Sequence, residues 1–290
     1  MNLSVALKLG RVSNLPTVWS NVLTGMALAG SATADCRLLL LVVSLSLFYV
    51  GGMFLNDAFD RDFDAEHRPE RPIPSGQVSA QQVFVIGFGL LAIGLAGVAA
   101  ASRGPGGMPA WRALASGAAL AAAIVFYNAH HKGNPLSPLV MGLCRVLVYL
   151  TAAFSLALVL PAAVYLAAIA LLCHLIGLTY IAKQEHLDRI GTLWPLGFLA
   201  VPVLYGLVLA LSAPITWAPL LLYVAVLAIA LNLLRRRARG DVPRAVVTLI
   251  AGMSVLDGVM LAGAGLLLPA LLAIAAFVLT LALQRWVAGT

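Results

Sequence analysis

Residues 56–76 read NDAFDRDFDAEHRPERPIPSG and follow directly on a long apolar run. This stretch holds six of the eleven acidic residues in the 290-residue chain, together with three arginines. Only 10% of the residues are charged, against roughly 25% in a soluble domain, so the concentration of charge here points to chemistry. Asn56, Asp60 and Asp64 recur every four residues, and on a continuing helix their side chains would share one face.

The residue types in this stretch favour a magnesium–diphosphate site. Carboxylate and amide oxygens suit Mg²⁺, which commonly bridges to the phosphate oxygens of a substrate. Asn56, Asp60 and Asp64 are therefore predicted metal ligands. Arg68 and Arg71 lie in RPERPIPSG, where proline and glycine exclude a regular helix, and arginine forks match diphosphate oxygens. The alternative is a solvated loop in which acids and arginines only pair with one another.

The rest of the chain has the composition of a multi-pass membrane protein. Hydrophobic residues make up 62% of it, and apolar stretches of about twenty residues, the length of a bilayer-spanning helix, recur from end to end. The three cysteines lack metal-binding spacing and are expected to pack. Basic residues in such proteins usually mark cytoplasmic loops. The net charge of +7 therefore predicts contact with membrane lipids and no nucleic-acid partner.

Breaks at proline, glycine and charged residues divide the chain into ten candidate helices. The last two are separated only by GAGLLLP, so nine or ten transmembrane helices are expected. Alternating the spans places thirteen Lys and Arg residues on the side of the loop 60–78 and three on the other. The positive-inside tendency makes that side cytoplasmic, which predicts a protein of the inner (cytoplasmic) membrane. The candidate helices are 14–32, 37–59, 79–102, 108–128, 137–160, 162–187, 192–212, 215–236, 243–264 and 267–286.

Residues 56–76 closely resemble the NDxxDxxxD signature and the following RPxPSG segment of the UbiA superfamily of intramembrane prenyltransferases. LPTVWSNVLTGMALAG, residues 15–30, resembles that family's first helix. The resemblance implies one domain over residues 1–290, an all-α polytopic bundle around a central cavity that opens sideways to lipid. It also implies Mg²⁺-dependent transfer of an isoprenoid from its diphosphate to an acceptor. A tenth span would depart from the nine that are usual there.

The family carries a second aspartate-rich motif, DxxxD, after its sixth helix, and this chain has TYIAKQEHLDRIG there. Placing Asp188 on the last acid puts Gln184 on the first, with Tyr180 and Lys183 as expected diphosphate contacts. A Gln carbonyl can bind Mg²⁺ but brings no charge, so Gln184 and Asp188 would form a weaker second metal site. Aligning on the following Ile-Gly instead puts Lys183 and Leu187 at the acid positions. That alternative abolishes the second metal site and leaves Lys183 to contact diphosphate directly.

Several other polar residues lie in apolar surroundings. Tyr127 and Lys132 resemble residues that face the family's diphosphate pocket, although Lys132 could equally anchor at the membrane interface. Asn21 matches a pocket asparagine, with a helix-to-helix hydrogen bond as the alternative. Intramembrane charges usually face a cavity or each other. An Arg145–Asp257 pair, a phosphate contact by Arg145 and proton acceptance by Asp257 all stay open.

The histidines are not expected to do chemistry. His130 and His131 are neighbours in sequence, point in different directions on a helix, and are predicted to lie at the membrane interface. His174 is predicted to be a packing residue.

The resemblance implies that Asp60, Asp64 and Asp188 are the catalytic acids and that an isoprenoid diphosphate binds at the cytoplasmic mouth. The acceptor stays open between an aromatic ring, a tetrapyrrole carboxylate, a sugar and a glycerol phosphate. Because Gln184 removes an acid, a non-catalytic isoprenoid-binding or transport protein on the same scaffold is the alternative. An intramembrane aspartyl protease is disfavoured, because its chemistry has no use for the arginine-rich loop.

Overall fold

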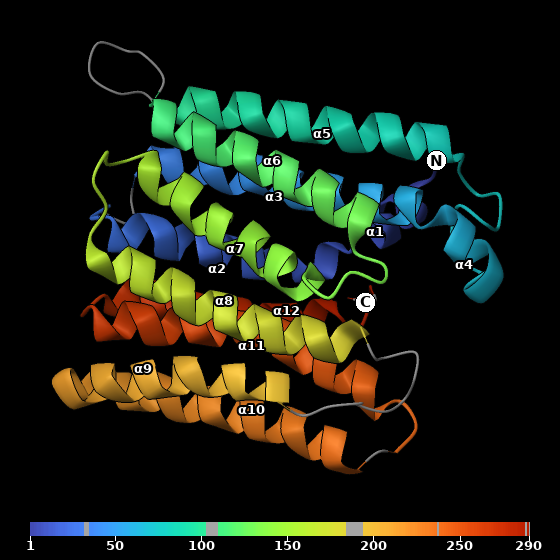
Figure 1. The fold of residues 1–290 in the computed structure, drawn as a ribbon. Coiled ribbons are helices and arrows are strands. Elements are labelled where there is room, and N and C mark those ends of the chain that lie inside the picture. Colours follow the sequence, from blue (N-terminus) through green and yellow to red (C-terminus); the bar gives the residue numbers. More distant parts are fainter. Residues whose placement is uncertain (32–34, 103–109, 184–193, 237, 288, 290) are drawn as a thin grey trace.

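The computed structural model describes the chain except for residues 32–34, 103–109, 184–193, 237, 288 and 290. The described residues are helical and include no strand, so the predicted all-α class is confirmed. The long helices lie side by side, and both termini lie at the same end of the bundle (Figure 1). The helices are α1 Leu3–Leu9, α2 Leu15–Leu28, α3 Cys36–Phe59, α4 Arg61–His67, α5 Ala80–Ala101, α6 Trp111–His130, α7 Ser137–Phe154, α8 Ala162–Lys183, α9 Ala200–Ser212, α10 Trp217–Arg236, α11 Asp241–Gly263 and α12 Leu267–Leu283.

Every one of the ten predicted segments contains a helix. Within the described residues, eight helical segments are long and apolar enough to cross a bilayer. α2 and α12 run alongside them (Figure 1) but have only 14 and 17 residues. The choice between nine and ten crossings therefore stays a prediction. GAGLLLP forms a tight hairpin, in which Gly265 has φ +76° and the Leu266 N–H donates to the carbonyl of Leu261.

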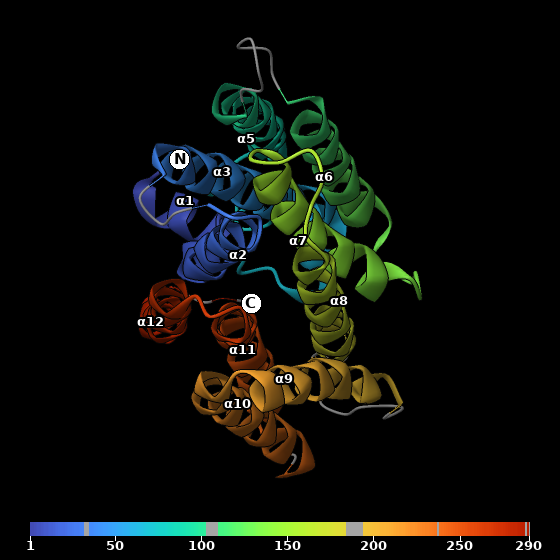
Figure 2. The same ribbon diagram turned by 90° about the vertical axis from the view of Figure 1, so that its left-hand side faces the viewer.

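Two buried apolar clusters form the interior, and α2 and α7 belong to both. One cluster joins these helices to α3, α5 and α6, and includes Val22 and Val148. The other joins them to α8, α9, α10, α11 and α12, and includes Leu28 and Tyr149. In the end-on view, α2 and α7 lie between the two groups of helices (Figure 2). Polar side chains on these two helices therefore face the centre of the molecule.

Glycines allow the closest helix contacts, as the small residues in GGM and GMALAG suggest. A Cβ atom on Gly51 of α3 would lie 2.8 Å from the carbonyl oxygen of Gly87 on α5. A Cβ atom on Gly25 of α2 would lie 2.6 Å from the carbonyl oxygen of Tyr149 on α7. In membranes such small residues let helix backbones approach closely, so Gly25 sets the spacing of α2 and α7.

At the opposite end from the acidic stretch, α3 begins with a charged cap. Asp35 Oδ1 accepts a hydrogen bond from the backbone N–H of Arg37 at 2.9 Å, and Arg37 Nη2 donates to Asp35 Oδ2 at 2.7 Å. The hydrogen-bonded Arg37 guanidinium lowers the pKa of Asp35 to about 2. The cap is thus charged at neutral pH, where it favours the helix N-terminus.

Gly25→Ala is expected to lower the melting temperature of the detergent-purified protein, because overpacking a helix contact typically costs about 1–3 kcal/mol. Gly89→Ala is the matched control, since no atom lies within 4 Å of a Cβ at Gly89 and alanine favours a helix by about 1 kcal/mol. Its melting temperature should be unchanged or higher. Equal melting temperatures for the two variants would contradict the close contact of α2 with α7.

Candidate active site

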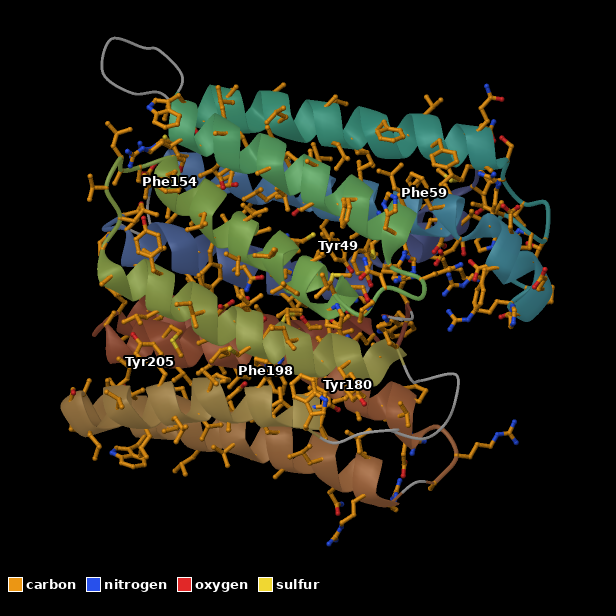
Figure 3. All side chains as sticks on the ribbon, viewed as in Figure 1. Tyr49, Phe59, Phe154, Tyr180, Phe198 and Tyr205 are labelled. Atoms are coloured by element: carbon orange, nitrogen blue, oxygen red, sulfur yellow. The ribbon has the colours of Figure 1, made fainter. Side chains whose placement is uncertain are left out.

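The acidic stretch is not one continuous helix, so the condition under which Asn56, Asp60 and Asp64 would share one helix face is not met, and the helix predicted over 37–59 ends at residue 59 as expected. α3 ends at Phe59, which is labelled in Figure 3, and α4 begins at Arg61. Asp60 lies between them with φ −84° and ψ −1°, and α4 extends past the end of the bundle (Figure 1). Asn56 and Asp64 are nevertheless buried. The polar groups therefore meet through the turn between two helices and not along one helix face.

Arg71 joins the two helices. Its Nη1 atom lies 3.1 Å from Asp57 Oδ1 at the end of α3 and 3.1 Å from Asp64 Oδ2 in α4. The side chains of Asp57 and Asp64 are only 9% and 3% exposed. Acids and arginines thus pair with one another, as the alternative interpretation held, but the pairs are buried. Arg68 is half-buried and has no side-chain hydrogen bond or ion pair to any described residue.

Arg11 approaches the same acids from the N-terminal side. It lies between α1 and the short helix η1 (Val12–Asn14), and its Nη2 atom is 3.3 Å from both Asn56 Oδ1 and Asp57 Oδ1. Neither Arg11 nor Asp57 is among the residues that the sequence pattern predicts. Asp57 is the second letter of the signature and could have been found there. Arg11 is 46 positions from Asp57, and no local pattern connects them.

Asn56 is also held from the side of α6. Its Nδ2 atom donates to Asn128 Oδ1 at 3.2 Å, and Asn128 Nδ2 in turn donates to the carbonyl of Gly52 at 3.0 Å. Asn56 therefore has defined partners for both its oxygen and its nitrogen. Asn128 was not predicted as a site residue.

The turn between α6 and α7 supplies the partners of Asp60. Lys132 Nζ lies 2.8 Å from Asp60 Oδ1, and it stands 3.9 Å from the centre of the Phe63 ring. His131 Nε2 lies 3.6 Å from Asp60 Oδ2 and its ring stacks on Tyr127 at 5.0 Å. His131 thus faces Asp60, and its position at the membrane interface stays a prediction. The predicted residues Tyr127 and Lys132 both lie at this end of the bundle.

An apolar cavity of about 80 Å³ lies between α2, α3, α6 and α7. Asn128, the hydrogen-bond partner of Asn56, is part of its wall. Gly52, Met53 and Asn128 lie on the wall closest to the acids, and apolar side chains such as Leu45 and Leu120 lie deeper. Tyr49, labelled in Figure 3, lies on this wall inside the bundle. The remaining lining residues are Val18, Phe48, Ile124, Tyr127, Met141, Cys144, Arg145 and Val148.

Arg145 belongs to a buried polar cluster that joins α2, α7 and α11. Its Nη1 atom donates to Asn21 Oδ1 at 3.1 Å, and Asn21 Nδ2 donates to Asp257 Oδ2 at 2.8 Å. Tyr149 OH donates to the other oxygen of Asp257. Arg145 and Asp257 are therefore paired through Asn21 and not by direct contact. Arg145 lines the cavity but Asp257 does not, so a direct proton-accepting role for Asp257 finds no support.

Only part of the second motif falls within the described residues. Gln184 and Asp188 lie outside them. Lys183 is the last residue of α8, and its Nζ atom donates to the carbonyl of Asn134 at 2.7 Å and to Ser137 Oγ at 2.8 Å. Tyr180 lies half-buried one turn earlier on α8 and is labelled in Figure 3. Lys183 thus connects α8 to the turn that carries Lys132.

His174 is a packing residue, as predicted. Its ring nitrogens lie 2.8 Å from Tyr223 OH and 2.9 Å from the carbonyl oxygen of Leu249, so both are satisfied inside the bundle.

The oxygen atoms at the acidic turn suit a hard divalent cation. Asp57 Oδ1 and Asp64 Oδ2 lie at equal distances from one nitrogen of Arg71, so the guanidinium occupies the position between them. Within the described part of the chain, no three His, Cys, Asp or Glu side chains form a metal cluster by themselves. Mg²⁺ needs no such cluster, because it usually binds through one or two carboxylates together with substrate phosphates.

Helices long enough to cross a membrane surround an apolar cavity, and a cluster of buried acids and arginines lies at one end of the bundle, beside Asn128 on the cavity wall. The chain belongs to the UbiA prenyltransferase family, whose sequence profile matches residues 18–246. The matched region runs from α2 into α11 and contains the acidic turn and the whole cavity lining.

Individual relatives match over shorter regions. The digeranylgeranylglyceryl phosphate synthase of Methanopyrus kandleri is 32% identical over 130 residues, which is 45% of this chain and 45% of that protein. The synthase of Methanothrix thermoacetophila is 36% identical over 89 residues, covering 30% of this chain and 33% of the relative. The chain thus spans less than half the length of the curated relatives it matches.

Solved structures agree over nearly the whole length. A structure of digeranylgeranylglyceryl phosphate synthase superposes with a TM-score of 0.61 at 20% identity, covering 90% of this chain and 98% of that one. A UbiA homolog from Archaeoglobus fulgidus bound to DMAPP and Mg²⁺ gives 0.54 at 16% identity, covering 97% and 99%. At these identities the likeness establishes the shared fold.

Asp257→Asn and Arg145→Gln are each expected to lower the melting temperature, because breaking a buried charge pair typically costs about 3–5 kcal/mol. The double variant should lose less than the sum of the two, since neither charge is then left alone. Thermal unfolding of the four proteins in detergent measures the interaction energy, typically about 0.5–3 kcal/mol for residues in one network. Strictly additive losses would show that Asn21 does not connect the two charges.

Proposed function

We propose that the protein transfers a prenyl group from an isoprenoid diphosphate to an acceptor within the membrane, with Mg²⁺ at the acidic turn. One observation carries this proposal. Asp57, Asp64 and Arg71 converge beside Asn56, whose side chain donates to Asn128 on the wall of an apolar cavity. Polar oxygen ligands and a guanidinium suit a diphosphate, and the apolar lining suits the chain attached to it. The family membership and the bound DMAPP and Mg²⁺ of the Archaeoglobus homolog support the same assignment.

The residues at the end of the bundle that carries the acidic turn then have distinct roles. Asn56, Asp57, Asp60 and Asp64 supply metal oxygens, and bound Mg²⁺ neutralises the charge that develops on the leaving diphosphate. Arg68, Arg71 and Lys132 hold diphosphate oxygens, with Tyr127 and Tyr180 expected nearby. Gln184 and Asp188 are proposed for a second, weaker metal site. Lys183, which is bonded to the turn after α6, positions that turn.

The cavity determines what happens to the prenyl group. The C–O bond to the diphosphate breaks, and its electron pair leaves with the diphosphate, which the basic side chains stabilise. The resulting allylic cation is surrounded by apolar side chains of α3, α6 and α7, which exclude water. The acceptor forms the new bond to the prenyl carbon and releases one proton.

The names of the relatives suggest which acceptor to test first. Digeranylgeranylglyceryl phosphate carries two prenyl groups on a glyceryl phosphate, so the hydroxyl of a prenylated glyceryl phosphate is the first acceptor to test. The thirteen basic residues on one side of the predicted topology place the acidic turn on the cytoplasmic side of the membrane. Both substrates would then enter from the cytoplasmic leaflet.

Asp64→Asn and Asp60→Asn are expected to reduce diphosphate release by about 100-fold or more, since losing one group that stabilises charge costs about 10²–10³ in rate. Asp62→Asn is the matched control, because the Asp62 side chain is 87% exposed and pairs only with Arg61 at the surface. Release would be measured with detergent-purified protein, Mg²⁺, a membrane extract and geranyl, farnesyl or geranylgeranyl diphosphate.

The same assay separates catalysis from transport. Release that is abolished by EDTA and by Asp64→Asn, but not by Asp62→Asn, supports a transferase. Tight binding of the diphosphates without any release by the wild-type protein would instead favour the isoprenoid carrier. Equal release by all variants would contradict the role of the acidic turn.

A further inference from the structure

Asp57, Asp60 and Asp64 each form an ion pair with a basic side chain from outside helices α3 and α4. Asp57 Oδ1 lies 3.3 Å from Arg11 Nη2 and 3.1 Å from Arg71 Nη1, and Asp64 Oδ2 is 3.1 Å from the same nitrogen of Arg71. Asp60 is paired with Lys132. The basic partners come from the turn after α1, from the loop after α4 and from the turn after α6. Their charges balance those of the acids.

The pairs made by Arg11 and Arg71 are sheltered from water, so their electrostatic interactions are strong. The Arg11 and Arg71 side chains are 19% and 16% exposed, and their carboxylate partners are less exposed still. Interactions between charges strengthen as the effective dielectric constant falls. A single extra positive charge in this balanced cluster is therefore strongly unfavourable unless a negative charge enters with it.

A divalent cation between Asp57 and Asp64 would compete directly with Arg71. Mg²⁺ binds carboxylate oxygens at about 2.0–2.1 Å, and the two oxygens that bracket this position already accept from one guanidinium nitrogen. Arg71 must therefore release at least one of these oxygens. A diphosphate offers the displaced guanidinium new oxygens of the kind it binds best, and brings the negative charge that the metal requires.

The backbone of Arg11 shows that its position is specified. Arg11 has φ +41°, a left-handed conformation that is uncommon for residues other than glycine and costs energy unless the surroundings hold it. Its carbonyl oxygen accepts from the backbone N–H of Asn14 and from Tyr49 OH. This conformation directs the guanidinium to Asn56 and Asp57.

We propose that Arg11 and Arg71 are internal counter-ions of the acidic turn, which exclude a free divalent cation and admit it only together with a diphosphate. The two guanidiniums move from carboxylate to diphosphate oxygens as the pair of ligands binds. This inference rests on the proposed function and adds that the metal and the diphosphate each bind tightly only when the other is bound. Arg11 becomes a diphosphate-binding residue of the site.

Binding of Mn²⁺, followed by electron paramagnetic resonance with and without inorganic pyrophosphate, tests the inference without requiring turnover. Wild-type protein should bind Mn²⁺ weakly alone and at least about tenfold more tightly with pyrophosphate, within the usual 5–150-fold range of coupling between ligands. Arg71→Gln should bind Mn²⁺ alone at least about tenfold more tightly than wild type, with the pyrophosphate effect largely lost. Arg11→Gln should shift both quantities in the same direction by a smaller factor.

Two controls isolate the charge. Arg71→Lys keeps the positive charge and should bind Mn²⁺ alone as weakly as wild type. Arg61→Gln removes an arginine of the same stretch that pairs with exposed Asp62 and lies over the Phe84 ring, and should change neither affinity. If Arg71→Gln does not fold, the Arg11→Gln measurement decides in its place.

The outcomes distinguish this inference from the proposed function. Wild-type protein that binds Mn²⁺ with pyrophosphate, while neither Arg71→Gln nor Arg11→Gln gains affinity for Mn²⁺ alone, overturns the counter-ion role and leaves the transferase standing. Wild-type protein that binds no Mn²⁺ under either condition overturns the metal site and this inference together.

Discussion

The hydrocarbon core of a membrane offers no water to polar groups, and this constraint arranges the whole molecule. The backbone satisfies its own hydrogen bonds as helices, and a polar side chain must find a partner or lie at a helix end. Inside the bundle, hydrogen bonds across α2, α7 and α11 join the side chains of Arg145, Asn21, Asp257 and Tyr149. All the other charged groups discussed above lie where the helices end.

Chemistry at a helix end draws on residues that are distant in sequence. The break at Asp60 turns α4 away from α3, and the following loop brings Arg71 back between them. Arg11 and Lys132 enter from two further turns. The cavity behind them is lined by α2, α3, α6 and α7. The acidic turn is therefore a meeting point of four segments around one mouth, which a single-helix description would miss.

Periodic and compositional signals predicted the helices well, because apolar runs long enough to span a membrane have few alternative structures. The acids of residues 56–76 could be proposed as a candidate site because clustered charges are rare beside a membrane helix. The spacing of Asn56, Asp60 and Asp64 could not decide whether the helix continues past Asp60, because a four-residue spacing fits a straight helix and equally two helices joined by a turn. Arg11 escaped prediction because its contacts with Asn56 and Asp57 exist only in three dimensions. The sequence named Lys132 and Asp60, and Arg145 and Asn21, but only the structure shows that the members of each pair contact one another.

The two hydrogen bonds of Lys183 have a mechanical consequence. They fix the end of α8 to Asn134 and Ser137, and Asn134 follows Lys132, the partner of Asp60, by two residues. Any displacement of the end of α8 is therefore transmitted through this short segment to the acidic turn. The first aspartate-rich motif and the helix that leads into the second are thus joined through one short turn, which carries Lys132 on one side and the partners of Lys183 on the other.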